Sequence, residues 1–225
     1  MGTIIEAKNM TLQYNIKENP IIQNLSLSIG ANEFIVLTGS SGSGKTTILK
    51  SLYGALKIQQ GHLTVCGIDM TSPTNNVLMH LRRNIGIIFQ DYCLVDEWNI
   101  EENIMLPLKI KGFSHVTCLK QAHKLLVHVK LLHKCKHFPH ELSGGEQQRV
   151  AIARAIAHNP LLILADEPTG NLDSYSSEVI WDLLKAVNRH LGTAIVIATH
   201  HAPMFKNIHY KQYTLHNRTC NVTSL

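Results

Sequence analysis

The stretch GSSGSGKTT, residues 39–47, constrains the fold of this 225-residue chain more than any other segment. It follows EFIVLTG, an apolar run of strand length, and it leads into ILKSLYG, where Ile48, Leu49 and Leu52 form one apolar helix face. A strand, a glycine-rich loop and a helix that follow one another without a gap are typical of a phosphate-binding loop. The order is not GxGxxG, and a lysine follows the last glycine, so a dinucleotide-binding turn is excluded.

Each residue type in this loop has a chemical reason. Glycines let backbone N–H groups turn inward around a β-phosphate, a lysine reaches the β- and γ-phosphates, and a threonine hydroxyl binds Mg²⁺. We therefore expect the loop to hold a nucleoside triphosphate with Mg²⁺, the metal being bound by Thr46. The expected nucleotide-binding residues are Gly39, Ser40, Ser41, Gly42, Ser43, Gly44, Lys45, Thr46 and Thr47.

A second chemical signal is the stretch LLILADEPTGNLD, residues 161–173. Its apolar run reads as a strand buried on both faces, and it ends in two consecutive acids. Two adjacent carboxylates at a strand end are costly unless a cation and a water separate them. Asp166 is the expected Mg²⁺ ligand, through water, and Glu167 the expected base for an attacking water.

The rest of the chain alternates strands with helices, which predicts an α/β fold with a largely parallel sheet. Residues 91–142 have a helical texture, and an amphipathic helix is expected over 176–191. The apolar TAIVIATH predicts a second buried strand, and IHYKQYTL, residues 208–215, predicts a strand at a sheet edge.

The stretch LSGGEQQRVAIARA, residues 142–155, adds a serine and two glycines at a helix start. With the two earlier motifs it resembles the signature of the ATP-binding subunits of ABC transporters, and the resemblance covers nearly the whole chain. It implies a P-loop NTPase fold of the ABC ATPase type: a RecA-like core with an antiparallel β subdomain and an inserted α-helical subdomain. We expect one ATP-binding domain over 1–225, with its catalytic core in 1–90 and 143–225 and its helical subdomain in 91–142.

The resemblance also assigns roles to residues outside the phosphate loop. Tyr14 is similar to the aromatic residue that stacks on adenine. Gln90 is similar to a glutamine that contacts Mg²⁺ and the attacking water, and His200 to a histidine at the γ-phosphate. Catalysis is thus expected from Glu167, His200 and Gln90.

Further implied contacts require two copies of the chain. In the family two subunits pack head to tail, so that Ser143, Gly144 and Gly145 of one face the γ-phosphate held by the other. Asp173 resembles an acid of the same interface. A homodimer with composite ATP sites is therefore expected. His201 stands where an aspartate is usual, and strand alignment favours His200 over His201 as the residue at the nucleotide.

The stretches DEPTGNLD and LRRNIGIIFQ resemble one branch of the family. That branch contains the ATPases of lipoprotein-releasing, macrolide-export and FtsE-type cell-division complexes. We expect a peripheral protein on the cytoplasmic face of the cell membrane that energises an integral-membrane permease subunit of an exporter or lipoprotein-release complex. An FtsE-type ATPase that signals through a membrane partner is the alternative. Leu94, Val95 and Trp98 are expected to line a groove for that partner.

Composition excludes other classes. The net charge of +5 is scattered, without the interleaved aromatic residues of a nucleic-acid surface. No apolar run approaches the ~18 residues of a membrane span, and the start lacks a signal peptide. The five cysteines form no CxxC pair and predict reduced thiols. Among 14 histidines, His133 and His137 have the i,i+4 spacing of helical metal ligands, although a solvated helical face is the favoured interpretation.

Overall fold

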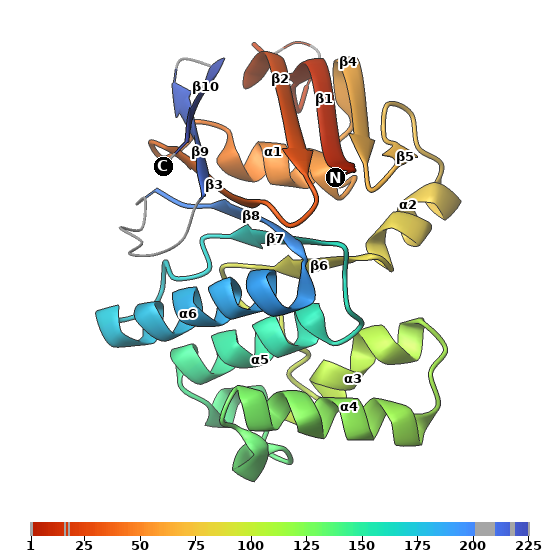
Figure 1. Ribbon diagram of the computed structural model, residues 1–225, viewed down its shortest axis with the longest axis vertical. Helices are drawn as coiled ribbons and strands as arrows, with labels where there is room; N and C mark the ends of the chain where they lie inside the picture. Colours follow the sequence, from red (N-terminus) through yellow and green to blue (C-terminus); the bar gives the residue numbers. More distant parts are fainter. Residues whose placement is uncertain (1, 16, 18, 201–209, 217–218, 225) are drawn as a thin grey trace.

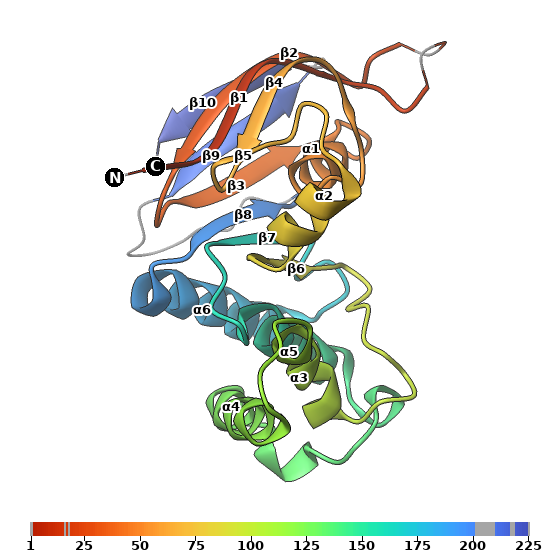
Figure 2. The same ribbon diagram turned by 90° about the vertical axis from the view of Figure 1, so that its right-hand side faces the viewer.

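The computed structural model describes residues 2–15, 17, 19–200, 210–216 and 219–224. Its strands form two sheets, a four-stranded antiparallel sheet in the order β2-β1-β4-β5 and a six-stranded sheet in the order β10-β9-β3-β8-β7-β6 (Figures 1 and 2). The strands are β1 (Thr3–Leu12), β2 (Ile22–Gly30), β3 (Phe34–Gly39), β4 (Ile58–Val65), β5 (Ile68–Asp69), β6 (Ile85–Ile88), β7 (Leu162–Asp166), β8 (Ala194–Ala198), β9 (Lys211–His216) and β10 (Thr219–Ser224).

The helices cover the six-stranded sheet on both sides. One helix, α1, lies between the two sheets, and four longer helices lie on the opposite face (Figure 2). The helices are α1 (Lys45–Leu52), α2 (Asn75–Arg82), α3 (Ile100–Ile110), α4 (His115–His128), α5 (Gly144–Ile156) and α6 (Ser174–Leu191), with short 3₁₀ turns η1 (Leu132–Lys134) and η2 (Pro139–Glu141).

The core is divided into two hydrophobic clusters by the six-stranded sheet. Alternate residues of β3 point to opposite faces: Phe34 and Val36 pack with the helices, and Ile35 and Leu37 pack with α1 and the smaller sheet. All four are buried, which explains why the strand sequence is continuously apolar instead of alternating.

Parallel pairing brings several strand ends to one edge of this sheet. β3, β8, β7 and β6 run parallel, and Ala198 of β8 is aligned with both Leu37 of β3 and Asp166 of β7. Residues that follow these strands in the sequence therefore meet at the same edge. The phosphate loop, the two consecutive acids, Gln90 and His200 all lie at such strand ends or just beyond them.

The predicted edge strand was placed wrongly. β9 lies between β3 and β10, not at an edge, because residues 219–224 add a further antiparallel strand beside it. The stretch TCNVTS has few apolar residues, so the sequence contains no hydrophobic pattern from which strand β10 could be predicted. Positions 208–209 of the predicted strand lie outside the described residues.

The helical segment ends earlier than the apolar periodicity suggests. α4 stops at His128, where Lys130 adopts a left-handed φ of 60° and the Leu131 N–H donates to the Leu126 carbonyl at 2.8 Å. His133 lies in η1 and His137 in the loop beyond it, so the two histidines do not share a helix face. The helical i,i+4 premise of the metal hypothesis for this pair is therefore wrong.

Within the described ranges, every helix is too short or too polar to cross a lipid bilayer.

One buried histidine predicts how the fold responds to acid. His158 donates from Nε2 to the Ile85 carbonyl at 3.2 Å, and burial together with the nearby Lys111 ammonium lowers its pKa to about 4. An unfolded histidine titrates near pH 6.5, so between pH 6.5 and 4 the unfolded chain binds a proton that the folded chain does not. This residue therefore stabilises the fold above pH 6.5, and its contribution is lost as the pH falls towards 4.

We expect the His158→Gln variant to lose less stability than the natural chain when the pH is lowered from 6.5 to 4, because glutamine can donate to Ile85 without titrating. Urea midpoints measured across this range test the prediction. The exposed His128→Gln is the matched control and should behave like the natural chain. An unchanged pH dependence in His158→Gln would contradict the assignment.

Candidate functional site

The phosphate loop connects β3 to α1 and encloses its own lysine. The buried Lys45 ammonium donates to the carbonyls of Gly39 and Ser40, at 2.8 and 3.1 Å. Gly44, immediately before α1, has a left-handed φ of 103°, and a β-carbon there would come within 2.7 Å of Ile22. Only glycine satisfies both constraints without strain. The loop therefore has the shape in which backbone N–H groups can surround an anion.

The loop also contains a polar atom without a protein partner. The Ser43 hydroxyl is buried and makes no hydrogen bond to the described residues. Buried hydroxyls are normally paired. This orphaned group is consistent with a site completed by a phosphate oxygen.

Thr46 and Asp166 form an oxygen pair beside the loop. The Thr46 hydroxyl donates to Asp166 Oδ1 at 3.0 Å, although 120 positions separate the two residues. Burial raises the pKa of Asp166 although the hydrogen bond from Thr46 opposes the shift, and the adjacent Glu167 charge adds to the increase. A cation at this point would offset the cost of the buried negative charge.

Glu167 is held in a strained position directly after β7. Its φ is 45°, an uncommon value for a residue with a side chain, and its N–H donates to the Ala198 carbonyl at 2.8 Å. Its carboxylate accepts a hydrogen bond from His200 Nδ1 at 2.9 Å. The acid is mostly buried whereas half of the histidine side chain is exposed. Such strain concentrates at functional sites because the surrounding structure must hold it.

Gln90 approaches this pair across Gly170. A β-carbon on Gly170 would lie 3.4 Å from the Glu167 β-carbon and 3.5 Å from Gln90 Nε2, so the glycine occupies the narrow space between them. Asn171 donates to the Gln90 carbonyl at 3.2 Å and fixes its backbone. The sequence did not identify Gly170 or Asn171 as site residues, although both lie in the TGN of the acidic motif.

These groups share one open cleft. It has a volume of about 610 Å³, and a second cleft of about 390 Å³ adjoins it and shares Ser41 and Gly42 of the phosphate loop with it. Asp166 lines neither cleft, but it accepts the hydrogen bond of Thr46, which lines the larger one. Of the expected residues, Ser41, Gly42, Gly44, Lys45, Thr46, Thr47, Gln90, Glu167 and His200 line the larger cleft, and Ser40, Ser41, Gly42 and Ser43 line the smaller one.

The signature serine and glycines lie elsewhere in the chain. Ser143 caps α5, where its N–H donates to Glu146 and its hydroxyl accepts from the Glu146 N–H. None of residues 143–145 lines either cleft among the described residues. Within one chain, the phosphate loop and the signature residues 143–145 therefore do not form a common site. This is expected if the signature residues contact the nucleotide bound to another copy.

An ion pair that sequence reasoning missed fixes the signature loop. Lys134 of η1 donates to the Glu146 carboxylate at 2.7 Å. Burial would raise the pKa of Glu146, but the bonds from Lys134 and Ser143 outweigh it and hold the pKa at about 2. The capping carboxylate is consequently ionised at neutral pH.

Two further expected residues lie outside the clefts. Tyr14 follows β1 and is half exposed, with the Lys50 ammonium of α1 at 5.6 Å from its ring centroid. It thus lies beside α1, the helix that follows the phosphate loop, and is open to solvent. Asp173 caps α6 through the N–H and hydroxyl of Ser176, and these bonds lower its pKa.

The segment after Gln90 is held in shape by two side chains that the sequence patterns did not single out. The fully buried Asn103 carboxamide accepts a hydrogen bond from the Val95 N–H and donates one to the Val95 carbonyl. Arg154, in the last turn of α5, donates to the carbonyls of Tyr92 and Cys93 at 2.7 and 2.6 Å. The signature helix and the segment after Gln90 are therefore directly joined.

The three residues expected to line a groove for the partner differ in how they pack against the core. Leu94 packs partly against the helical hydrophobic cluster, and Val95 is half-buried. Trp98 is half-buried beyond that cluster, with the Lys109 ammonium 5.5 Å from its ring centroid. Trp98 is the bulkiest candidate anchor of the three, and it is not among the residues that pack against that cluster.

Comparison with known proteins identifies relatives over most of the chain. The chain is 38% identical to the cell division ATP-binding protein FtsE of Streptococcus pneumoniae, over 96% of this chain and 93% of that protein. It is 41% identical to the lipoprotein-releasing system ATP-binding protein LolD of Hydrogenovibrio crunogenus, over 88% and 87%. A solved dimeric structure of the ATP-binding cassette MJ0796 bound to ADP and Pi has a TM-score of 0.87, with 34% identity and 98% of each chain covered.

A family model described as ABC transporter matches residues 22–170, which include the phosphate loop, the signature and the acidic pair. The expected family and its fold are thereby confirmed. The chain belongs to the ABC transporter family of ATPases.

Proposed function

We propose that two copies of this chain, packed head to tail, bind and hydrolyse ATP with Mg²⁺ and thereby drive an integral-membrane partner. The observation that carries the proposal is the convergence at one sheet edge of a phosphate loop, a hydroxyl–carboxylate oxygen pair, and an acid hydrogen-bonded to a histidine. Each group has a separate task in phosphoryl transfer to water.

Lys45 binds the phosphates by exchanging its carbonyl acceptors for phosphate oxygens. Its ammonium already has hydrogen bonds to the carbonyls of Gly39 and Ser40, so it is held at the loop in a buried position. A charged phosphate oxygen is a stronger acceptor than a neutral carbonyl. The exchange of a carbonyl for a phosphate oxygen is therefore favourable, and the lysine side chain does not first have to be ordered.

Thr46 and Asp166 would hold Mg²⁺. A hydroxyl and a carboxylate, 3.0 Å apart and partly buried, form the hard oxygen donor set that this ion prefers, with the remaining positions left to water and phosphate. When bound, the ion would neutralise charge that develops on the phosphate oxygens.

Glu167 accepts the proton of the attacking water. His200 donates to the carboxylate and so orients it, while Gln90 on the far side of Gly170 holds the water in line. The strained backbone of Glu167 fixes the position from which its side chain extends. The carboxylate therefore needs little reorganisation when it acts as the base. Ser143 of the opposite copy, at the positive end of α5, completes the site at the γ-phosphate.

The membrane partner docks on the segment after Gln90 and holds the chain peripherally at the cytoplasmic face. The similarity to a lipoprotein-releasing relative over 88% of the chain supports a complex that extracts or exports its cargo. The similarity to an FtsE relative over 96% of the chain supports the second candidate, an ATPase that signals through a membrane protein in cell division.

The Glu167→Gln variant separates nucleotide binding from chemistry. It keeps the shape of the side chain but removes the base, so turnover should fall by about 10²–10⁴ while ATP still binds. Trapped ATP should also leave the two copies associated. Steady-state phosphate release and size-exclusion chromatography with ATP measure both effects. The exposed Glu178→Gln is the control, and normal hydrolysis by Glu167→Gln would assign the base to another residue.

The Gly145→Asp variant tests the head-to-tail arrangement in a Glu167→Gln background. The added carboxylate should repel the γ-phosphate of the opposite copy and abolish ATP-dependent dimers, while binding of ATP to the monomer survives. Light scattering measures the dimers.

A steric control is required, because a β-carbon on Gly145 would also lie 2.9 Å from the Ser176 hydroxyl. Gly145→Ala introduces that contact without the charge. We expect it to retain much more dimer than Gly145→Asp. Equal loss in both variants would show that the contact with Ser176 is responsible, and dimers of Gly145→Asp would refute the arrangement.

The Trp98→Ala variant tests the partner surface. Loss of a large aromatic anchor should weaken partner binding by about 2–4 kcal/mol and remove stimulation of ATPase by the partner. Basal ATPase and the melting temperature should stay near those of the natural chain. Phe113→Ala is the matched control, because this half-exposed residue lies beyond the C-terminal end of α3. A large fall in melting temperature would show that Trp98 serves the core instead.

A further inference from the structure

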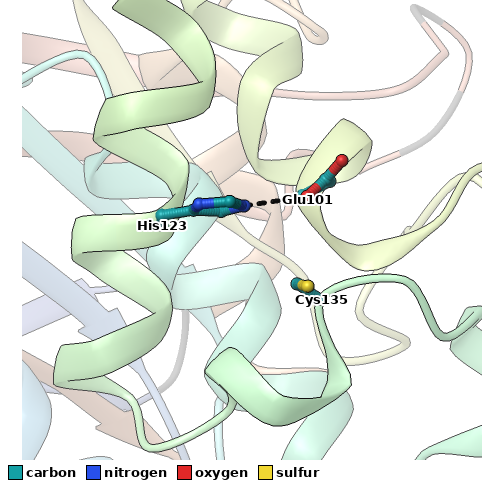
Figure 3. A group of neighbouring side chains, drawn as sticks. All are labelled: Glu101, His123 and Cys135. Carbon is teal, nitrogen blue, oxygen red and sulfur yellow. Dashed lines mark hydrogen bonds and ion pairs between the residues drawn. The ribbon is translucent and has the colours of Figure 1, made fainter.

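Three side chains of different chemical classes converge on the helical side of the molecule. Glu101 comes from the first turn of α3, His123 from the middle of α4, and Cys135 from the loop that follows η1 (Figure 3). Their ligating atoms all lie within 4.8 Å of one another. In the ranges that the structure describes, no other set of three such groups is equally close.

Backbone contacts fix this arrangement in advance. The Glu101 N–H donates to the Cys135 carbonyl at 3.0 Å, and the neighbouring Ile100 N–H donates to the His137 carbonyl at 2.9 Å. The loop that carries the cysteine is thus bound to the first turn of α3. Because those N–H groups have no partner inside their own helix, the loop satisfies them and loses much of its freedom.

The carboxylate has one oxygen available to the cluster. Only 6% of the Glu101 side chain is exposed; Oε2 contacts His123 Nε2 at 2.9 Å, and Oε1 pairs with the Lys136 ammonium. Lys136 extends into solvent and can keep Oε1 whatever happens at Oε2. It orients the carboxylate in the way that supporting side chains orient metal ligands.

We propose that Glu101, His123 and Cys135 bind a divalent transition-metal ion of the zinc class. Imidazole nitrogen, thiolate sulfur and carboxylate oxygen are the three ligand types of protein-bound Zn²⁺, and three protein ligands leave a fourth position for water. That position is accessible, since 42% of the His123 side chain is exposed. A thiolate and an imidazole make the site unsuited to Mg²⁺ or Ca²⁺.

Binding requires a defined exchange of protons. The proton on His123 Nε2, now shared with Glu101, moves through solvent to Nδ1, and the freed lone pair takes the metal. The Cys135 thiol releases its proton to solvent and binds as a thiolate. Thiolate and carboxylate together offset the double positive charge of the ion. Affinity must therefore fall as the pH is lowered.

An occupied site would join elements that otherwise meet only through weaker contacts. It would connect α3 to α4 and both to the loop at Cys135, the residue after Lys134. Lys134 in turn holds Glu146 at the start of the signature helix. The metal would thus fix the support of Ser143, and it would do so independently of the function proposed for the ATP cleft.

Cobalt titration tests the proposal, because Co²⁺ bound to a thiolate absorbs in the near ultraviolet whereas Co²⁺ on oxygen and nitrogen ligands does not. We expect untagged, nucleotide-free protein to gain this absorption at one ion per chain and to lose it when Zn²⁺ is added. No cysteine is among the described residues that line the proposed ATP cleft, so Co²⁺ bound there should not give the signal.

Variants assign the signal to residues. Cys135→Ser should abolish it, and His123→Gln should weaken Co²⁺ binding by at least about tenfold. The controls are Cys93→Ser, another accessible thiol, and His128→Gln, an exposed histidine on the same helix. Both should titrate like the natural chain. Absorption that persists in Cys135→Ser, or that is lost equally in the controls, would overturn the assignment.

Thiol alkylation tests the proposal on the natural chain, so the result cannot arise from a variant that fails to fold. Zn²⁺ should slow alkylation of Cys135 by at least about tenfold, since only a free thiolate reacts readily, and should leave alkylation of Cys93 unchanged. Peptide mass spectrometry measures both rates in one sample. Equal rates at Cys135 with and without Zn²⁺ would show that the cluster is an ordinary ion pair beside an uninvolved thiol.

Discussion

The site depends on the parallel register of four strands. Ala198 is aligned with both Leu37 and Asp166, so β3, β7 and β8 all end at the same edge of the sheet. A register slip of one residue would turn every side chain of a strand to the other face and exchange the partners of both hydrophobic clusters. The buried core on each side therefore specifies, with the same residues, where the loops of the cleft begin. Stability and the geometry of the cleft are set by one constraint.

Much of this arrangement could be predicted because the informative residues are local in sequence. The phosphate loop is recognised by spacing alone, and an acid after an apolar run marks the end of a buried strand. That Thr46 and Asp166 meet across 120 positions follows from parallel pairing, a general rule that needs no knowledge of the chain. The family and fold predictions were confirmed for this reason. The roles assigned to individual side chains remain proposals.

What could not be predicted depends on long-range partners. The polar β10 is a strand only because β9 offers it a hydrogen-bonding edge, and its presence moves β9 away from the edge. Neither Asn103 nor Lys134 belongs to a motif, and each acts through a contact that tertiary structure creates. Histidine spacing was misleading because α4 ends at His128. The histidine of the proposed metal site is His123. Its partner Glu101 is distant from it in the sequence and lies on another helix, so no local spacing reveals the pair.

The double hydrogen bond from Arg154 to the carbonyls of Tyr92 and Cys93 has a kinetic consequence. Both of those residues have a left-handed backbone, which an unsupported loop would adopt only part of the time. A binding surface that is populated only in part slows association and weakens affinity by that fraction. In the proposed docking on this segment, the surface would already be assembled before any encounter, so capture of the partner would be limited by diffusion and orientation, not by a conformational search.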